Sequence, residues 1–288
     1  MIFCIIEGSV FLKILITGAN GQLGKELVRR LHGTDFLATG SAEMDITDQR
    51  KTLQVITEYE PDVVIHSAAY TNVDGAEANS DTAYKVNAIG TQNVAAASLK
   101  IGARMVYVST DYVFDGTLGR AYNEFDQTNP QSVYGKTKLA GEVLAKHILN
   151  RLYIVRTSWL YGDGNNFVRT MLKLGQERDK LKVVNDQFGS PTSTKDLAET
   201  ILRLVDTEHY GTFHVVNTGV TTWYNFAQKI FEICGNHNVK VVSQTTEELG
   251  RLAPRPRYSP LNNMMLELTI GNIMRPWQET LTEYLSAK

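Results

Sequence analysis

The sequence is poor in cysteine, with only two among its 288 residues. Cys4 and Cys234 lie far apart in the chain, and neither has metal-ligand spacing around it. This excludes a disulfide framework and a cysteine-based zinc site. We therefore expect a protein of the reducing cytoplasm, and the sequence predicts no metal ligands.

Long hydrophobic runs and excess charge are also missing. No apolar run approaches the roughly 18 residues of a membrane-spanning helix. The formal net charge is −2 and the isoelectric point is near 6.3, so there is no basic surface for nucleic acid or for an anionic membrane. We expect neither as a partner. The first eleven residues begin with an apolar run that Glu7 interrupts, without the basic start of a signal peptide, so residues 1–11 are interpreted as an N-terminal extension.

Glycine is concentrated where the first predicted strand ends. Residues 12–17 form a mostly apolar run typical of a buried parallel strand, and helical periodicity follows up to Leu31. The motif Gly18-x-x-Gly21-x-x-Gly24 lies between them and includes Gln22 and Leu23. Glycines here let the backbone approach a pyrophosphate that rests on the amides of the helix N-terminus. The alternative is a tight turn without a ligand.

The second strand predicts a dinucleotide without fixing which one. It ends at Thr39-Gly40-Ser41, with neither the acidic residue that binds ribose hydroxyls nor an arginine for a 2′-phosphate. NADPH and NADH both stay open as cofactors. Asp45 and Ile46 are predicted to contact the adenine, and an exposed loop acid is the equal alternative for Asp45.

Strands and helices alternate through the first half of the chain. The strand at 63–67 opens into the small residues Ala68 and Ala69 and then Tyr70, against which a cofactor can lie. His66 is interpreted as a packed residue at this strand end. The strand at 104–108 is followed by Ser109-Thr110-Asp111. The alternation predicts an α/β fold, a Rossmann-type doubly wound parallel sheet.

Tyr134 and Lys138 are four residues apart in a predicted helix, so both side chains extend from one face. A tyrosine hydroxyl normally titrates near ~10. A nearby ammonium group favours the phenolate, and we expect Lys138 to lower the pKa of Tyr134. Such a pair can exchange a proton near neutral pH, which reduction of a carbonyl requires. A chance pair on a surface helix is the alternative.

Taken together, these motifs resemble the extended short-chain dehydrogenases/reductases. Within that superfamily, residues 109–116 resemble the dTDP-4-dehydrorhamnose reductase family, as do residues 72–77, 156–162, 186–192 and 254–259. The similarity extends over roughly residues 12–285. It implies a catalytic set of Tyr134, Lys138 and Thr110, an NADPH or NADH cofactor that Tyr134 and Lys138 also contact, and a dTDP-sugar substrate.

The resemblance also implies roles for other residues. Asn87 would organise the helix behind the cofactor site. Asp111 and Val73 would border the sugar, Trp159 would offer it an aromatic face, and Arg257 or Arg255 would meet the diphosphate. A buried core position is the equal alternative for Trp159, and a solvated surface position for the arginines.

The second half of the chain is expected to add a smaller C-terminal substrate-binding lobe. The predicted division is 12–156 plus about 196–220 for the NAD(P)-binding domain, and about 157–195 plus 221–288 for the lobe. Thr194 is a predicted N-cap of the helix that ends at Val205. Mg²⁺ is not indicated by the sequence, and both a magnesium role and a homodimer stay open.

Three other functions share these features. A sugar-nucleotide epimerase or a dehydratase has the same fold and the same Tyr/Lys pair. Dehydratases pair Asp and Glu after the catalytic Thr, whereas Asp111-Tyr112 follows Thr110 here, which disfavours elimination. The third is the non-catalytic regulatory subunit of methionine adenosyltransferase, which resembles this family. The intact tyrosine, lysine and glycines favour a working enzyme.

Overall fold

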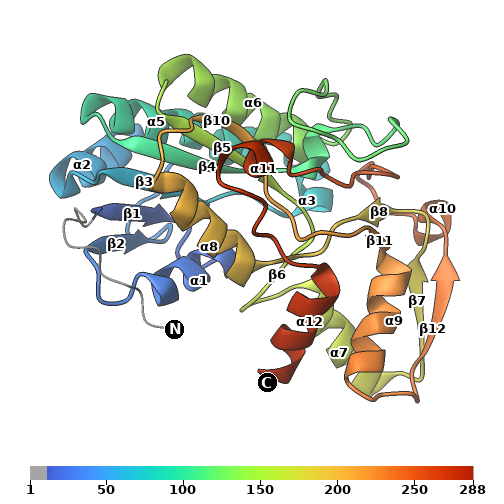
Figure 1. Ribbon diagram of the computed structural model, residues 1–288. Coiled ribbons are helices and arrows are strands. Elements are labelled where there is room, and N and C mark those ends of the chain that lie inside the picture. Colours follow the sequence, from blue (N-terminus) through green and yellow to red (C-terminus); the bar gives the residue numbers. More distant parts are fainter. Residues whose placement is uncertain (1–11, 288) are drawn as a thin grey trace.

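The computed structural model describes residues 12–287, so the predicted extension 1–11 lies outside the described residues. Six parallel strands form the central sheet in the order β10-β5-β4-β3-β1-β2. Figure 1 shows helices on both of its faces, which confirms the predicted doubly wound α/β fold. The strands are β1 (Ile14–Thr17), β2 (Phe36–Thr39), β3 (Val63–His66), β4 (Arg104–Thr110), β5 (Leu152–Thr157) and β10 (Gly211–His214).

Alternate residues of the strands supply two separate cores. Ile14 and Ile16 face the layer of α1 (Gln22–Arg30) and α8 (Thr194–Val205), whereas Leu15 faces the layer of α2, α5 and α6. Side chains on a strand alternate between the two faces, so a strand covered on both sides is apolar at nearly every position. The helices of the second layer are α2 (Gln49–Tyr59), α5 (Thr91–Lys100) and α6 (Val133–Ile148).

One helical region departs from regular α-helix geometry. Between α4 (Ser80–Tyr84) and α5 the chain forms a π-helical segment, η1 (Lys85–Gly90). Such segments are rare and occur often at functional sites. Gly90 at its end makes room for Ile46, whose Cδ1 would lie 2.7 Å from a Cβ at this position.

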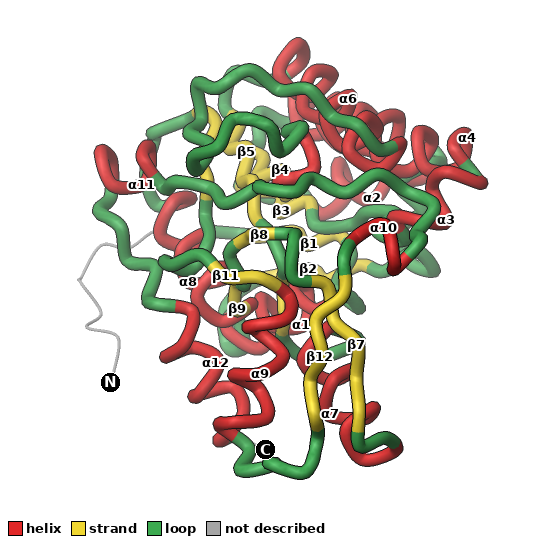
Figure 2. The backbone as a smooth tube through the Cα atoms, turned by 90° about the vertical axis from the view of Figure 1, so that its right-hand side faces the viewer, coloured by secondary structure: helices red, strands yellow, loops and turns green. Residues whose placement is uncertain are grey.

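A smaller lobe has its own core of buried apolar side chains from α7, α9, α12 and β7. In Figure 1 these elements lie beside the sheet's carboxyl ends, and in Figure 2 β7 and β12 run side by side as a parallel pair. α11 (Met264–Thr269) contributes Leu266 to the core of the central sheet instead. The lobe contains α7 (Phe167–Glu177), β7 (Lys180–Val184), α9 (Trp223–Ile233), β12 (Lys240–Gln244) and α12 (Trp277–Ser286).

The N-cap of α8 differs from the prediction by one residue. The Ser193 side chain accepts from the Lys195 backbone N–H, so Ser193 is the N-cap and Thr194, the predicted cap, is the first helical residue. The short elements are α3 (Val73–Ala78), η2 (Asp111–Val113), β6 (Leu160–Tyr161), β8 (Phe188–Gly189), β9 (Thr192–Ser193), β11 (Thr221–Thr222) and α10 (Thr246–Leu249).

Candidate active site

A cavity of about 830 Å³ lies outside the carboxyl ends of the strands. Its position follows from the topology: β2 lies on one side of β1 and β3 on the other, and the connecting helices α1 and α2 lie on opposite faces of the sheet, which opens a crevice between the βα loops. Of the predicted site residues, those in the cavity wall are Gly18, Gly21, Gln22, Leu23, Gly24, Asp45, Ile46, Ala68, Ala69, Val73, Thr110, Asp111, Tyr134, Lys138 and Trp159.

The glycine loop fits a dinucleotide because two of its positions admit no side chain. Gly18 has φ +70°, and a Cβ there would lie 2.6 Å from the backbone nitrogen of Ala68. A Cβ on Gly24 would lie 2.2 Å from the carbonyl oxygen of Gly18. The close packing of loop and helix leaves the first N–H groups of α1 at the cavity, where a pyrophosphate binds.

Asn87 and Tyr70 lie behind the cavity wall. The buried Asn87 accepts from the Tyr70 backbone N–H at 2.7 Å and donates to the Tyr70 carbonyl at 3.1 Å and to Thr137 at 2.9 Å. The amide of η1 thus joins the loop after β3 to α6, which carries Tyr134 and Lys138. His66 is a packed core residue, as expected: it shares hydrogen bonds with Thr17 and Thr91, and burial lowers its pKa to about 3.

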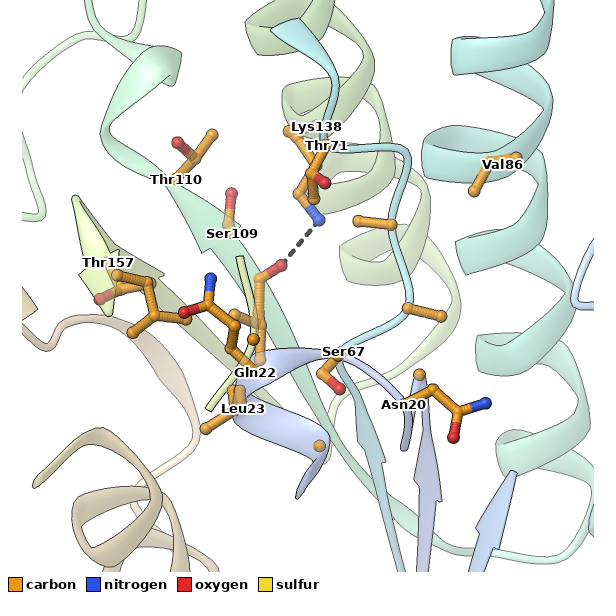
Figure 3. Close-up of a pocket in the computed structure, with 18 of the residues that line it drawn as sticks. Asn20, Gln22, Leu23, Ser67, Thr71, Val86, Ser109, Thr110, Lys138 and Thr157 are labelled. Carbon is orange, nitrogen blue, oxygen red and sulfur yellow. Dashed lines mark hydrogen bonds between the residues drawn. The ribbon is translucent and has the colours of Figure 1, made fainter. Parts of the chain in front are cut away.

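The reactive side chains come from β4 and α6 (Figure 3). Lys138 is buried, and its Nζ donates to the carbonyl of Val108 at 2.7 Å. Burial lowers the pKa of Lys138 to about 7, and the Glu142 carboxylate, one turn further along α6, acts in the opposite direction. Ser109 donates to Glu142 at 2.5 Å, and Arg156 pairs with it at 2.7 Å, so a buried ionic network supports this wall.

The predicted lowering of the Tyr134 pKa was wrong. Burial, with a smaller contribution from the charge of Asp111, raises the pKa of Tyr134 to about 12 against the lowering effect of a hydrogen bond with Thr110. Lys138 does not offset this rise: its Nζ donates to the Val108 carbonyl, and burial disfavours its own positive charge. Tyr134 is therefore a protonated phenol at neutral pH.

Thr110 and Asp111 end β4 at the cavity wall. The Thr110 hydroxyl donates to Asp111 Oδ1 at 3.1 Å and accepts from the Tyr112 backbone N–H at 3.2 Å. Asp111 is almost fully buried, and burial raises its pKa to about 6 although a hydrogen bond from Ser259 lowers it.

The predicted arginines do not reach the cavity. Arg257 is exposed and pairs with Glu247. Arg255 is held by Asp74, with its two terminal nitrogens 3.1 and 3.0 Å from the carboxylate oxygens. Each arginine is thus paired with its own carboxylate, Glu247 or Asp74. The sequence pattern gave no indication of these partners.

Trp159 lies in the wall and has an aromatic partner that the sequence did not reveal. Its ring stacks on Trp223 with centroids 3.5 Å apart and an interplanar angle of 8°. Trp223 is the first residue of α9, and it also lines the cavity. Only its aromatic character at a helix start was visible in the sequence, and this is equally typical of a core residue.

The described part of the chain contains neither a cluster of metal-binding side chains nor a membrane-spanning helix. Within residues 12–287, no group of three or more His, Cys, Asp or Glu side chains could hold a metal ion. No helix of these residues is long and apolar enough to cross a membrane.

Comparisons with known proteins show the family of the chain. A family described as "RmlD substrate binding domain" matches residues 12–288. The dTDP-4-dehydrorhamnose reductase of Mycobacterium tuberculosis is 42% identical, over 96% of this chain and 93% of its own. The crystal structure of a dTDP-4-dehydrorhamnose reductase from Clostridium acetobutylicum has a TM-score of 0.94 at 52% identity, covering 96% of this chain and 99% of that one. That of the Bacillus anthracis reductase, in complex with NADP, has a TM-score of 0.93 at 47% identity, covering the same shares. The chain therefore belongs to the dTDP-4-dehydrorhamnose reductase family of extended short-chain dehydrogenases/reductases.

Proposed function

We propose that the protein reduces dTDP-4-dehydro-β-L-rhamnose to dTDP-L-rhamnose with NADPH or NADH, the final step of dTDP-L-rhamnose biosynthesis. The observation that carries the proposal is the meeting of Tyr134, Thr110 and Lys138 at one wall of a dinucleotide-sized cavity behind a glycine loop. Relatives named for this reaction share the arrangement of the whole chain.

The cofactor would lie along the carboxyl ends of β1 and β3. Gly18, Gly21 and Gly24 would hold its pyrophosphate, Asp45 and Ile46 its adenine, and Ala68 and Ala69 its nicotinamide half. Tyr70 and Asn87 would shape that wall from behind. When bound, the reduced nicotinamide supplies the hydride that the C4 carbon of the keto sugar needs.

Tyr134 would donate the proton to the C4 oxygen, because its raised pKa keeps it protonated at neutral pH. Lys138 would contact the nicotinamide ribose and, as a cation, stabilise the phenolate left by proton transfer. Thr110 would hydrogen-bond the same substrate oxygen and orient it beside Tyr134.

The sugar would be bordered by Asp111 and Val73, and Trp159 would offer it an aromatic face. Arg257 is not part of the diphosphate site, because its side chain pairs with Glu247 and does not line the cavity. The separate core of α7, α9 and α12 supports a substrate lobe of about 157–195 plus 221–288, beside a cofactor domain of 12–156 plus about 196–220. A reducing cytoplasm as the location, and a homodimer, stay part of the proposal.

The test is the decrease of reduced-nicotinamide absorbance with enzymatically prepared dTDP-4-dehydro-L-rhamnose. The wild type should oxidise NADPH or NADH, and Tyr134→Phe should lose about 10²–10⁴-fold in kcat, the usual contribution of a proton donor. Phe keeps the ring and, with Lys138 still in place, should retain most of the cofactor affinity. Cofactor binding without oxidation of either nicotinamide would reject the reductase and favour a non-catalytic role such as that of a regulatory subunit.

A second candidate substrate has a specific observation behind it. The dTDP-4-keto-6-deoxy-D-glucose reductase of Streptomyces niveus is 38% identical over 93% of this chain and 95% of its own. The same assay with dTDP-4-keto-6-deoxy-D-glucose therefore serves as the comparison. A higher kcat/KM for that sugar would make dTDP-4-keto-6-deoxy-D-glucose the assigned substrate in place of dTDP-4-dehydro-L-rhamnose. The proposed residues would keep the same roles.

A further inference from the structure

Ser259 reaches the active site from a distant part of the sequence. Its hydroxyl donates to Asp111 Oδ2 at 2.7 Å across a separation of 148 residues. Both side chains are buried, with 2% of each residue exposed. The Ser259 backbone N–H donates to the carbonyl of Phe188 at 3.0 Å, so β8 fixes the serine from the other side. Ser259 does not line the cavity and cannot be recognised there as a substrate contact.

The contact continues towards the reacting groups. Asp111 Oδ2 accepts from Ser259, Asp111 Oδ1 accepts from Thr110, and Thr110 is hydrogen-bonded to Tyr134. A threonine hydroxyl has a single proton to donate. For Thr110 to turn that proton to a substrate oxygen, Asp111 must release it. Besides the backbone N–H groups of Asp111 and Tyr112, a carboxylate that keeps a second side-chain donor releases the proton at lower cost, because fewer of its buried lone pairs lose a partner.

Few titratable or charged side chains act on the Asp111 carboxylate. Tyr112 on its own η2 turn and Tyr134 on α6 face it, and the Asp111 charge raises the pKa of both. The Arg255–Asp74 pair lies beyond Tyr112 and acts on that tyrosine. Within residues 12–287, no lysine or arginine forms an ion pair with Asp111. The neutral hydroxyls of Ser259 and Thr110 are therefore its side-chain partners.

We propose that Ser259 is a positioning residue for the reduction: it holds the Asp111 carboxylate in place and thereby frees the Thr110 hydroxyl to orient the substrate oxygen beside Tyr134. The inference rests on the proposed roles of Thr110 and Tyr134. It adds to the site a residue from the loop that precedes α11.

The direction of the pH effect follows from the hydrogen bond. Ser259 stabilises the ionised carboxylate, whereas burial favours the protonated acid and raises the pKa of Asp111 to about 6. Without the serine hydroxyl the pKa of Asp111 should rise further. Below that pKa the neutral acid carries an O–H of its own, which can donate to the Thr110 oxygen and change the orientation that the ionised carboxylate gives this hydroxyl. The acidic limb of the rate profile should therefore move to higher pH in Ser259→Ala.

The experiment compares the pH profiles of kcat and kcat/KM for the wild type, Ser259→Ala, Ser259→Thr and Ser190→Ala. Ser259→Ala should lower kcat about tenfold at pH 7, with KM for NADPH within about twofold, and should move the acidic limb up by about one pH unit. Ser259→Thr keeps the hydroxyl and should restore both. Ser190 is an equally buried serine that donates to the Gly219 carbonyl instead, so Ser190→Ala controls for the loss of a buried hydroxyl.

A second measurement is independent of turnover. In protein labelled with ¹³C at the aspartate carboxyl carbons, the Asp111 signal, identified by its loss in Asp111→Asn, should titrate near pH 6 and at a higher pH in Ser259→Ala. An unchanged Asp111 titration overturns the inference, whether or not the wild type is active. Unchanged pH profiles in an active Ser259→Ala enzyme overturn it as well, and leave the proposed function intact. A wild type that fails to oxidise NADPH rejects the proposed function, and the titration then decides on Ser259 and Asp111 alone.

Discussion

Lys138 Nζ donates to the Val108 carbonyl and lies 4.1 Å from the centroid of the Tyr107 ring. Burial nevertheless disfavours its positive charge. Its pKa is about 7 in the folded protein and 10.5 as a free side chain. Between these values the folded state binds fewer protons than the unfolded state, so the contribution of Lys138 makes stability rise with pH over this window. At and below about pH 7 the folded protein bears the whole cost of the buried charge.

Lys138→Met should therefore melt at a higher temperature than the wild type at pH 7, and this difference should shrink as the pH approaches 10. The same substitution should abolish turnover, because the phenolate of Tyr134 loses its cation. Thermal unfolding at pH 7, 8.5 and 10 tests this. Lys136→Met, at an exposed position of the same helix, is the control and should show no such pH dependence. A difference in melting temperature that is constant with pH would contradict a lysine of lowered pKa.

The Glu142–Arg156 pair should stabilise the fold only as long as both partners are present. Its side chains are 1% and 4% exposed, so Glu142→Gln leaves a buried cation without its counter-charge. We expect a loss of ~3–5 kcal/mol in the free energy of unfolding, the range for breaking a buried pair. The double variant Glu142→Leu/Arg156→Met should recover most of this loss, since apolar replacements need no partner.

Urea titration measures these changes. Glu199→Gln is the matched control, since Glu199 pairs with Arg203 on the surface of α8, and such exposed pairs contribute only ~0–1 kcal/mol. If Glu142→Gln were as mild as Glu199→Gln, the buried pair would not support the wall beneath Ser109.

Local chemistry predicted much of this site because it depends on short spacings. The glycine motif, the small residues after β3, Thr110 after β4 and the Tyr134/Lys138 pair all lie in the cavity wall or next to it. Each is set by one strand end or one helical turn. The contacts of Ser259 with Asp111 and of Trp223 with Trp159 could not be predicted in this way, because each partner comes from a distant segment that only the tertiary fold brings near.

The pKa of Tyr134 was mispredicted for a related reason. The helical spacing of Tyr134 and Lys138 was right, but spacing does not show how deeply the two side chains are buried. Burial acts on both pKa values more strongly than any charge does, raising one and lowering the other.

The glycine loop should tolerate a methyl group at one position better than at another. A Cβ on Gly24 would lie 2.2 Å from the Gly18 carbonyl oxygen, whereas a Cβ on Gly21 would lie 3.2 Å from the same atom. Gly24→Ala must push the backbone apart and should abolish measurable NADPH binding. Gly21→Ala requires a shift of a few tenths of an ångström and should weaken binding less. Calorimetric titration with NADPH measures both, and equal affinities for the two variants would contradict the packing of α1 against the loop.

Trp223 should hold Trp159 in the orientation that a substrate meets. Trp159 has φ +47°, an unusual backbone for a bulky residue. Its indole lies between Trp223 and Gly189, where a Cβ would approach Trp159 Cε2 to 2.4 Å. Stacked aromatic pairs contribute ~0.5–1.5 kcal/mol beyond their buried area. A loss of this free energy corresponds to at most about a tenfold change in affinity. Trp223→Ala should therefore raise KM for the sugar nucleotide up to about tenfold, while KM for NADPH stays the same.

The stack has its own spectroscopic signature, an exciton couplet of two indoles in circular dichroism, which Trp223→Ala should remove. Trp223→Phe keeps a ring against Trp159 and should lose the couplet but retain most of the affinity for the sugar nucleotide. This separates the two effects, because the signal depends on two indoles and the affinity on a rigid Trp159. A Trp223→Ala enzyme that lacks the couplet and yet keeps its KM for the sugar nucleotide would show that Trp159 needs no support from α9.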